Sequence, residues 1–441
     1  MKKITTIILF NILFLTPLRL RAETVDLNKF IDLVKQHSKN LLLAEKEKDI
    51  AKVNKKQAIS TALPKIAATA NYTRNLTSYY MYADFGKLGA MLGGAPGQVA
   101  KFKVKRDNEY SANIALQQTL FSPSVGSAIK AANQYQKLTD YSYTASKEAI
   151  LAGAKKMFYQ ALLLKKFWQV SRAAEKNAKD NYDNIKLKYE NGVVSEFETL
   201  QAKVRWKDAI PKTAEAKRNY ELALNNMKNW AGISVADSLN LNGAFDNYPV
   251  LPKKLPFAEI LKNRPDYNAM LWEQKLRKTN LGAKKSSYFP TLTGTAVYAY
   301  SAQSDYFKLD QQNNLYFAGL NLSFPIYTGG YRRSEVQKAK IEVEKSKVRI
   351  DQAKENIYNE ISNIYLRLAE AHERIASGKA TLQAAQKAFT IAESTAKSGL
   401  ATQLQLKDAR VGYDMAQMNY YSAIFDYLAA YFDWQRATGR E

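Results

Sequence analysis

Hydrophobic residues recur every seven positions from residue 331 to about residue 395. One series consists of Val336, Val343, Ile350, Ile357 and Ile364, and a second of Ile361, Leu368, Ile375, Leu382 and Phe389. Together they make an a/d seam, which faces a neighbouring helix over this length only if the helices supercoil left-handedly. At about 1.5 Å per residue, the stretch predicts a helical rod of roughly 100 Å. A cytoplasmic coiled coil is the commoner source of such heptads, so the seam alone leaves the protein class open.

Four shorter stretches alternate between apolar and polar residues, which is the period of a β-strand. The clearest covers residues 314–326, its counterpart covers 110–120, and weaker alternations cover 66–80 and 291–302. Each has the roughly 9 to 11 residues that a tilted strand needs to cross a bilayer. Ordinary hairpins packed on helices are the alternative interpretation.

The chain contains an internal duplication. Gly192 and Gly399 are 207 positions apart, and the residues around them match at the same offset, whereas Pro64 and Pro290 match at an offset of 226. The extra 19 residues fall in a long loop predicted at 80–106. This loop carries Gly86, Gly89, Gly93, Gly94, Gly97, Lys101, Lys103, Lys105 and Arg106. Long polar loops at one end of a strand pair are typical of the outer-surface hairpins of membrane barrels.

These patterns predict a mainly α-helical fold with a small β part. Residues 1–22 have the layout of a signal peptide, with two lysines, an apolar run and a cleavage point after Ala22. A first repeat (23–232) then contains a helix, a β-hairpin, a long helix and a returning helix. A proline-containing linker (233–256) leads to a second repeat of the same order (257–441).

The composition narrows the choice of function. The formal net charge is +24, but the lysines and arginines are spread over helix faces without a compact basic block, which argues against nucleic acid as a partner. Attraction to anionic lipid head groups is a secondary interpretation of the charge. There is no cysteine, and the two histidines, His37 and His372, stand in different predicted helices. We therefore expect no enzyme activity, no metal site and no cofactor.

Four strands raise a problem of unpaired edges. Known membrane barrels need at least about eight strands, and an open sheet edge in lipid would cost several kcal/mol for each unpaired group. Either the strands lie outside a membrane, or several chains share one barrel. Three chains would supply twelve strands, although the sequence itself does not determine the number of chains in the assembly.

The order of elements resembles that of the TolC-type outer-membrane efflux proteins over nearly the whole mature chain. The resemblance rests on residues 324–330 (Phe-Pro-Ile-Tyr-Thr-Gly-Gly), on residues 120–123 (Leu-Phe-Ser-Pro) and on the glycine turns at Gly192 and Gly399. It implies a homotrimer in the outer membrane, with four strands per chain in a 12-stranded β-barrel and long antiparallel helices forming a periplasmic α-barrel. It also implies passive export from an inner-membrane pump of the RND or ABC type through a periplasmic adaptor protein.

The two glycine turns correspond to the periplasmic tips of that family, where the pore closes and adaptors dock. Gly192 and Gly399 suit a helix C-cap, because glycine adopts the left-handed conformation at no steric cost. The alternative interpretation is that each glycine only ends its helix and has no role in docking. Val193 and Leu400, which follow the glycines, are apolar at turns predicted to be exposed, and they are the better docking candidates.

Beyond the turns, the resemblance places acidic residues around the pore entrance. Glu198 and Asp408 fall on such positions, whereas Gln405 replaces an acid and Ala401 replaces the arginine of well-known members. The alternative interpretation is that both acids lie on solvated helix faces. If they instead form a ring of carboxylates at the entrance, the pore would favour cations.

A periplasmic adaptor-type protein and a structural coiled-coil protein remain the alternatives to an export duct. The transported substrate and the particular pump cannot be inferred from the sequence.

Overall fold

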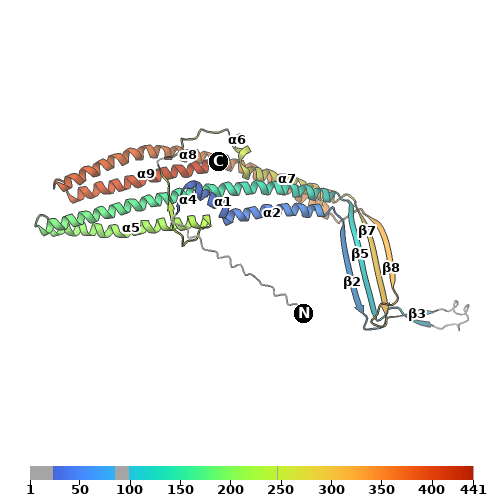
Figure 1. Ribbon diagram of the computed structural model, residues 1–441. Coiled ribbons are helices and arrows are strands. Elements are labelled where there is room, and N and C mark those ends of the chain that lie inside the picture. The colour runs from blue at the N-terminus through green and yellow to red at the C-terminus, as the bar shows by residue number, and fades with distance from the viewer. Residues whose placement is uncertain (1–22, 85–98, 246, 441) are drawn as a thin grey trace, which may run out of the picture. The chain divides into compact units, whose positions relative to one another are not determined.

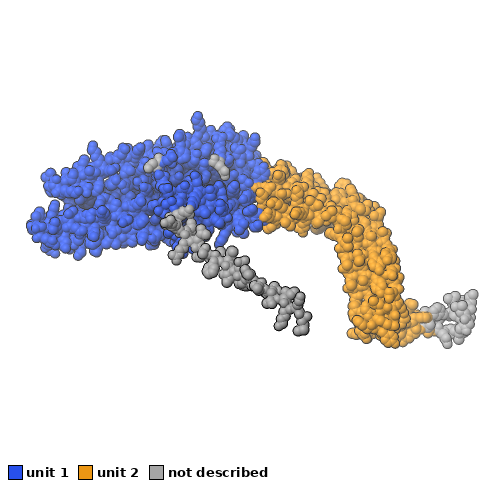
Figure 2. All heavy atoms as spheres, viewed as in Figure 1, with its two compact units in different colours: residues 1–47, 141–268, 351–441 blue, residues 48–140, 269–350 orange. Residues whose placement is uncertain are grey.

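The computed structural model describes residues 23–84, 99–245 and 247–440, so the predicted signal peptide (1–22) lies outside the described residues. The chain forms two compact units (Figure 2). We call them the helical unit (residues 1–47, 141–268 and 351–441) and the sheet unit (residues 48–140 and 269–350). Each unit takes segments from both predicted repeats, so the units do not coincide with the repeats, whose boundaries remain a prediction.

The sheet unit contains a four-stranded antiparallel sheet (Figure 1). In spatial order its strands are β2 (Lys65–Arg74), β5 (Asn108–Phe121), β7 (Thr291–Ser304) and β8 (Asn313–Ser323). Strand β5 comes from the first predicted repeat and β7 from the second, and the two pair along most of their length. This pairing joins the two hairpins into one sheet and leaves β2 and β8 at its edges.

Two of these strands are shorter than the alternation predicts. We expected strands over 66–80 and 314–326, but β2 ends at Arg74 and β8 ends at Ser323. Strand β8 stops opposite the first residue of β7, which follows Pro290. Because proline has no N–H to donate, the ladder cannot continue on that side, and alternation alone does not reveal where a partner strand begins.

Part of the loop predicted at residues 80–106 is a two-stranded ribbon. Strand β3 (Tyr80–Asp84) pairs antiparallel with β4 (Val99–Lys103). The prediction of a loop was wrong for these two segments, because aromatic, apolar and lysine side chains of the two strands pair there. The five glycines of the predicted loop lie outside the described residues.

Two long helical hairpins correspond to the duplicated helix pairs. The first consists of α4 (Pro123–Glu190) and α5 (Glu196–Ala231), and the second of α8 (Tyr331–Lys397) and α9 (Gln403–Thr438). The seam predicted for α8 is confirmed over most of its length. Its buried members are Val343, Ile350, Ile357, Ile361, Ile364, Leu368 and Ile375. Leu382 and Phe389 are half-buried in the single chain.

Shorter helices precede the hairpins. They are α1 (Leu27–His37), α2 (Lys39–Ser60), α6 (Phe257–Asn263) and α7 (Pro265–Ser286). Arg264 separates α6 from α7, which begins at Pro265, and Ser38, whose backbone is extended (φ −63°, ψ 115°), separates α1 from α2. None of the helices in the described ranges combines the length and apolar character that crossing a membrane requires.

The linker predicted at 233–256 is more ordered than its prolines suggest. It contains β6 (Leu239–Leu241), which pairs in parallel with β1 (Glu23–Val25). Farther along, the hydroxyl of Tyr365 donates to the carbonyl of Lys253 (3.0 Å) and accepts from the N–H of Leu255 (3.2 Å). The indole N–H of Trp434 also donates to this hydroxyl (3.1 Å). One tyrosine of α8 therefore fastens the linker to both helices of the second hairpin.

A buried arginine fixes the start of α7 against the same hairpin. Arg264 is only 4% exposed, and its guanidinium donates to both carboxylate oxygens of Asp266 (3.0 and 2.6 Å) and to Glu360 on α8 (2.6 Å). Arg436 on α9 shares Glu360. Because every charge here has a partner, the cluster is a structural tie within the helical unit.

Candidate functional site

The two glycine turns end α4 and α8 in the same way. Gly192 has φ +72° and Gly399 has φ +77°, the left-handed conformation that glycine adopts at no steric cost. After each glycine, the next N–H reaches back to a helix carbonyl, Val193 to Lys188 (2.8 Å) and Leu400 to Thr395 (2.9 Å). Both turns are therefore Schellman C-caps, which point the following residue away from the helix.

The returning helices begin with side-chain caps. Ser195 accepts from the N–H of Glu198 (3.3 Å) at the start of α5, and Thr402 accepts from the N–H of Gln405 (3.2 Å) at the start of α9. Gln405 completes a capping box, because its side-chain oxygen accepts from the N–H of Thr402 (2.9 Å). The residue that replaces an expected acid at the entrance thus has a local role at the helix start.

Asp408 lies beside a cation that sequence reasoning missed. Burial lowers the pKa of Arg205 on α5, and the negative charge of Asp408 partly offsets this effect. Arg205 donates from Nη1 to the carbonyl of Gln403 (2.9 Å), and the side chain of Gln403 accepts from Asn181 on α4 (2.9 Å). The start of α9 is therefore tied to both helices of the first hairpin. The hydrogen bond between Arg205 and Gln403 joins residues 198 positions apart, and no residue spacing in the sequence predicts it.

Glu198 takes a different position from Asp408. It lies in the first turn of α5, half-exposed, where a negative charge interacts favourably with the helix dipole. No hydrogen bond or ion pair between described side chains joins Glu198 to Asp408. Within one chain, the two carboxylates are not brought into direct contact.

The tips expose apolar side chains beyond the two that the sequence analysis singled out. Val193 is 70% and Leu400 is 82% exposed. The following helices continue this exposure with Phe197, Leu200 and Val204 on α5 and Leu404, Val411 and Met415 on α9. Phe197 and Leu404 match at the offset of 207, as do Val204 and Val411, so the duplication itself was the signal that would have found them.

Aromatic pairs hold the arms of each hairpin together near its tip. Tyr182 stacks on Trp206 with 5.5 Å between ring centroids and 18° between planes. Phe389 stacks on Tyr413 at 5.8 Å and 5°. The two pairs also match at the offset of 207, which means that both tips are built on the same plan.

Metal-ligating residues are not gathered anywhere in the part of the chain that the structure describes: it holds no group of three or more His, Cys, Asp or Glu side chains placed to bind an ion. The chemistry of the tips therefore consists of exposed apolar residues, two caps and the polar tie around Gln403 and Arg205.

The curated relatives match about half of this chain. The alkaline protease secretion protein AprF of Pseudomonas aeruginosa is 21% identical over 246 residues, which cover 54% of this chain and 50% of AprF. The outer membrane protein TolC of Escherichia coli is 21% identical over 249 residues, covering 53% and 50%. The chain thus spans about half the length of the curated relatives it matches.

Solved structures share the fold over almost the whole chain. The CmeC outer membrane channel of Campylobacter jejuni is 20% identical, with a TM-score of 0.78 over 94% of this chain and 85% of that one. The open state of the MtrE outer membrane channel of Neisseria gonorrhoeae is 19% identical, with a TM-score of 0.73 over 94% and 89%. The family of outer membrane efflux proteins matches residues 30–232 and 257–440, which together are most of the chain. With this fold and this match, the chain belongs to the outer membrane efflux protein family.

Proposed function

We propose that the protein is the outer-membrane exit duct of a tripartite efflux or secretion system. Family membership sets the protein in the outer membrane, with its helices extending into the periplasm. The observation that carries the proposal is the open-edged sheet of β2, β5, β7 and β8, which continues into two long helical hairpins. Periplasmic adaptors, the main alternative, also have helical hairpins, but neither the matched family nor the similar folds are of that class.

The edges of the sheet support a homotrimer. Strands β2 and β8 each leave one row of backbone groups unpaired in a single chain, and every residue of both strands is exposed. In lipid each unpaired group would cost several kcal/mol. The strands alternate in direction, so β8 of one copy meets β2 of the next in antiparallel orientation, and three copies give a closed barrel of twelve strands.

The helical hairpins supply the periplasmic part of the duct. Their tips expose Val193 and Leu400, which we propose as docking residues for a periplasmic adaptor protein, and the adaptor would connect the duct to an inner-membrane pump of the RND or ABC type. Asp408 and Glu198, with the capping residue Gln405, are proposed to line the pore entrance. Threefold symmetry would bring together carboxylates that one chain keeps apart.

Disulfide cross-linking tests the trimer, because the chain has no cysteine of its own. Ala70→Cys on β2 is combined with single cysteines scanned along β8, starting from Ala318→Cys. At least one pair should give a covalent trimer under oxidising conditions. A matched control combines Ala112→Cys on the inner strand β5 with Ala318→Cys and should stay monomeric on a non-reducing gel.

Fractionation and conductance test the duct itself. The purified protein should form discrete channels in planar bilayers, and the cell-borne protein should sediment with the outer membrane. Recovery in the soluble periplasm after osmotic shock, together with silent bilayers, would favour the adaptor or a structural coiled coil.

A further inference from the structure

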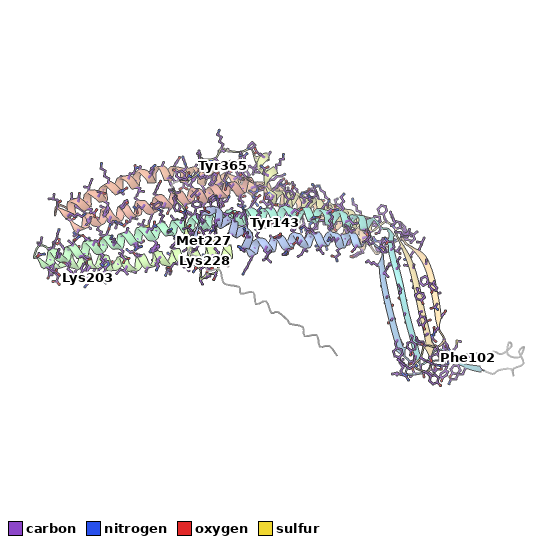
Figure 3. All side chains as sticks on the ribbon, in the orientation of Figure 1. Phe102, Tyr143, Lys203, Met227, Lys228 and Tyr365 are labelled. Atoms are coloured by element: carbon purple, nitrogen blue, oxygen red, sulfur yellow. The ribbon has the colours of Figure 1, made fainter. Side chains whose placement is uncertain are left out.

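The ribbon of β3 and β4 lies at the end of the sheet that is remote from the helical segments of the same unit (Figure 1). Strand β2 begins after α2 and ends at Arg74, so the chain reaches the ribbon only after the full length of the sheet. Figure 3 marks this end by Phe102. With the helices in the periplasm, as in the proposed function on which this inference rests, the ribbon stands at the outer surface. It lies in the segment that makes the first repeat longer than the second.

The register of the ribbon separates its side chains onto two faces. Tyr80 pairs with Lys103, Met81 with Phe102, and Tyr82 with Lys101. Because successive side chains of a strand point to opposite faces, the two tyrosines and two lysines share one face, and Met81 shares the other with Phe102. Met81 is 55% exposed and Tyr82 is 64% exposed. The ribbon is therefore amphipathic, with an aromatic and cationic face and an apolar face.

Ion pairs hold the base of the ribbon in place. Lys103 donates to Asp107 and to Asp305 (both 2.7 Å), and Arg106 donates to the other oxygen of Asp305 (2.7 Å). Asp305 directly follows β7, so these bonds fasten the ribbon to the second half of the sheet. The lysine and arginine bonds lower the pKa of Asp305 to about 2, and the carboxylate stays charged at any physiological pH.

The cations at this base outnumber the carboxylates. Lys103 and Arg106 share Asp107 and Asp305, whereas Lys101 and Lys105 have no carboxylate partner among the described side chains. The ammonium of Lys101 lies 3.9 Å from the ring centre of Tyr80, and Lys105 is exposed. The cation–π contact orients Lys101 but leaves its N–H groups available to an acceptor. The ribbon therefore carries two positive charges that no described side chain neutralises.

We infer that the ribbon of Tyr80–Asp84 and Val99–Lys103, with Lys105, is a binding site for the phosphate groups of glycolipids in the outer leaflet. Lysines and tyrosines at the end of a membrane strand are the residue types that lie at the boundary between lipid head groups and acyl chains. Lys101 and Lys105 bind phosphate oxygens, and Tyr82, which is exposed on the same face as Lys101, contacts the head group of the same lipid. A soluble polyanion would use the charges but would not account for tyrosines at the end of the membrane strands.

The test compares two lysine pairs in the full-length protein. Binding of a bis-phosphorylated lipid A, supplied in mixed micelles, is measured by native mass spectrometry and by titration with a fluorescent derivative. Each lysine near an anionic surface strengthens binding about fivefold, so Lys101→Ala with Lys105→Ala should weaken it about 30-fold. The matched control, Lys340→Ala with Lys347→Ala, removes two exposed lysines from α8 and should bind as the parent does. Lipid A stripped of both phosphates should bind the parent about as weakly as the intact lipid binds the ribbon variant.

Three outcomes would overturn the inference. They are equal binding by the two double variants, equal binding of phosphorylated and dephosphorylated lipid, and a ribbon variant that no longer assembles as the parent does. The last result would make the ribbon a contact between copies of the chain.

Channel conductance of the ribbon variant separates this inference from the proposed function. A variant that conducts normally but keeps full lipid binding refutes only the lipid site, whereas a parent protein that forms no channel refutes the duct.

Discussion

Arg205 of α5 donates a hydrogen bond from Nη1 to the backbone carbonyl of Gln403, at the first residue of α9 (2.9 Å). The bond joins the returning helices of the two hairpins close to their tips, and Asn181 of α4 adds a second bond to the same glutamine. A charged donor on a neutral acceptor contributes about 1.5–3 kcal/mol. The tip of the second hairpin is thus tied to the first by two hydrogen bonds to Gln403, of which the one from Arg205 is charged, and both would have to break if the two tips moved apart.

Replacing this cation should loosen the entrance. Arg205→Met keeps the length and apolar stem of the side chain but removes the bond to Gln403, and we expect a higher single-channel conductance or open probability in planar bilayers. Arg218→Met is the matched control, because Arg218 lies on the same helix and its ion pair is with Glu215 one turn away. Identical channels from both variants would show that the tie does not restrain the pore.

The carboxylates proposed for the entrance give a second prediction. Three chains would place six carboxylates of Glu198 and Asp408 near one axis, where like charges repel by about 1 kcal/mol or more per pair unless cations compensate. Glu198→Gln with Asp408→Asn should therefore lower cation selectivity and weaken block by divalent and trivalent cations. The control Asp208→Asn removes an exposed carboxylate from α5. If selectivity and block survive the double substitution, the two acids belong to solvated helix faces.

The long helix and the strands of this fold could be predicted because the spacing of their apolar residues reflects which side chains are buried. The heptads of α8 predicted a seam whose members from Val343 to Ile375 are buried, and the alternation at residues 314–326 predicted a strand, which the structure has as β8. The ends of β2 and β8 could not be predicted, since they depend on where the partner strand begins. The ribbon was missed because a long segment with many glycines gives a loop signal even when its two ends pair.

The candidate site was predictable to the extent that it is local. The positive φ of Gly192 and Gly399 and the exposure of Val193 and Leu400 agree with what glycine followed by an apolar residue indicates. The cap formed by Gln405 was readable from Thr-x-x-Gln but was interpreted as a departure from an acidic ring. The Arg205 bond depends on how α5 packs against α9, which no local pattern contains.

The buried arginine at the start of α7 should be essential for stability. Arg264→Met removes one partner each of Asp266 and Glu360, and a hydrogen bond between charged groups contributes about 1.5–3 kcal/mol. Burial raises the pKa of Asp266, but its bonds to Arg264 more than compensate, so the folded pKa lies below 3.8. A lowered carboxylate pKa contributes stability that is present above the unfolded value and is lost as the pH falls through the folded one.

The pH dependence separates this ion pair from simple packing. Thermal unfolding followed by circular dichroism should show the parent losing stability below about pH 4, and Arg264→Met should lose less over that range because its Asp266 is no longer stabilised in the charged form. Arg277→Met, which removes an arginine that is paired with Glu273 on the outer part of α7, serves as control. Parallel pH profiles for parent and Arg264→Met would contradict the assignment.

The exposed tips should matter for partners and not for the pore. Val193 and Leu400 are held outward by the Schellman turns, and their side chains have few contacts to lose within the chain. Val193→Ala with Leu400→Ala should therefore leave folding, assembly and single-channel conductance unchanged, while export in cells falls because the adaptor loses two apolar contacts, each contributing about 1 kcal/mol or more at a buried interface. Val250→Ala, at a highly exposed valine in the linker, is the control for loss of an exposed apolar side chain. Binding of a purified adaptor to the double variant, measured by biolayer interferometry, should weaken by about 30-fold for a combined loss of about 2 kcal/mol. Normal export and normal adaptor affinity would mean that docking uses another surface, and the exposed stripe beginning at Phe197 and Leu404 would be the next to substitute.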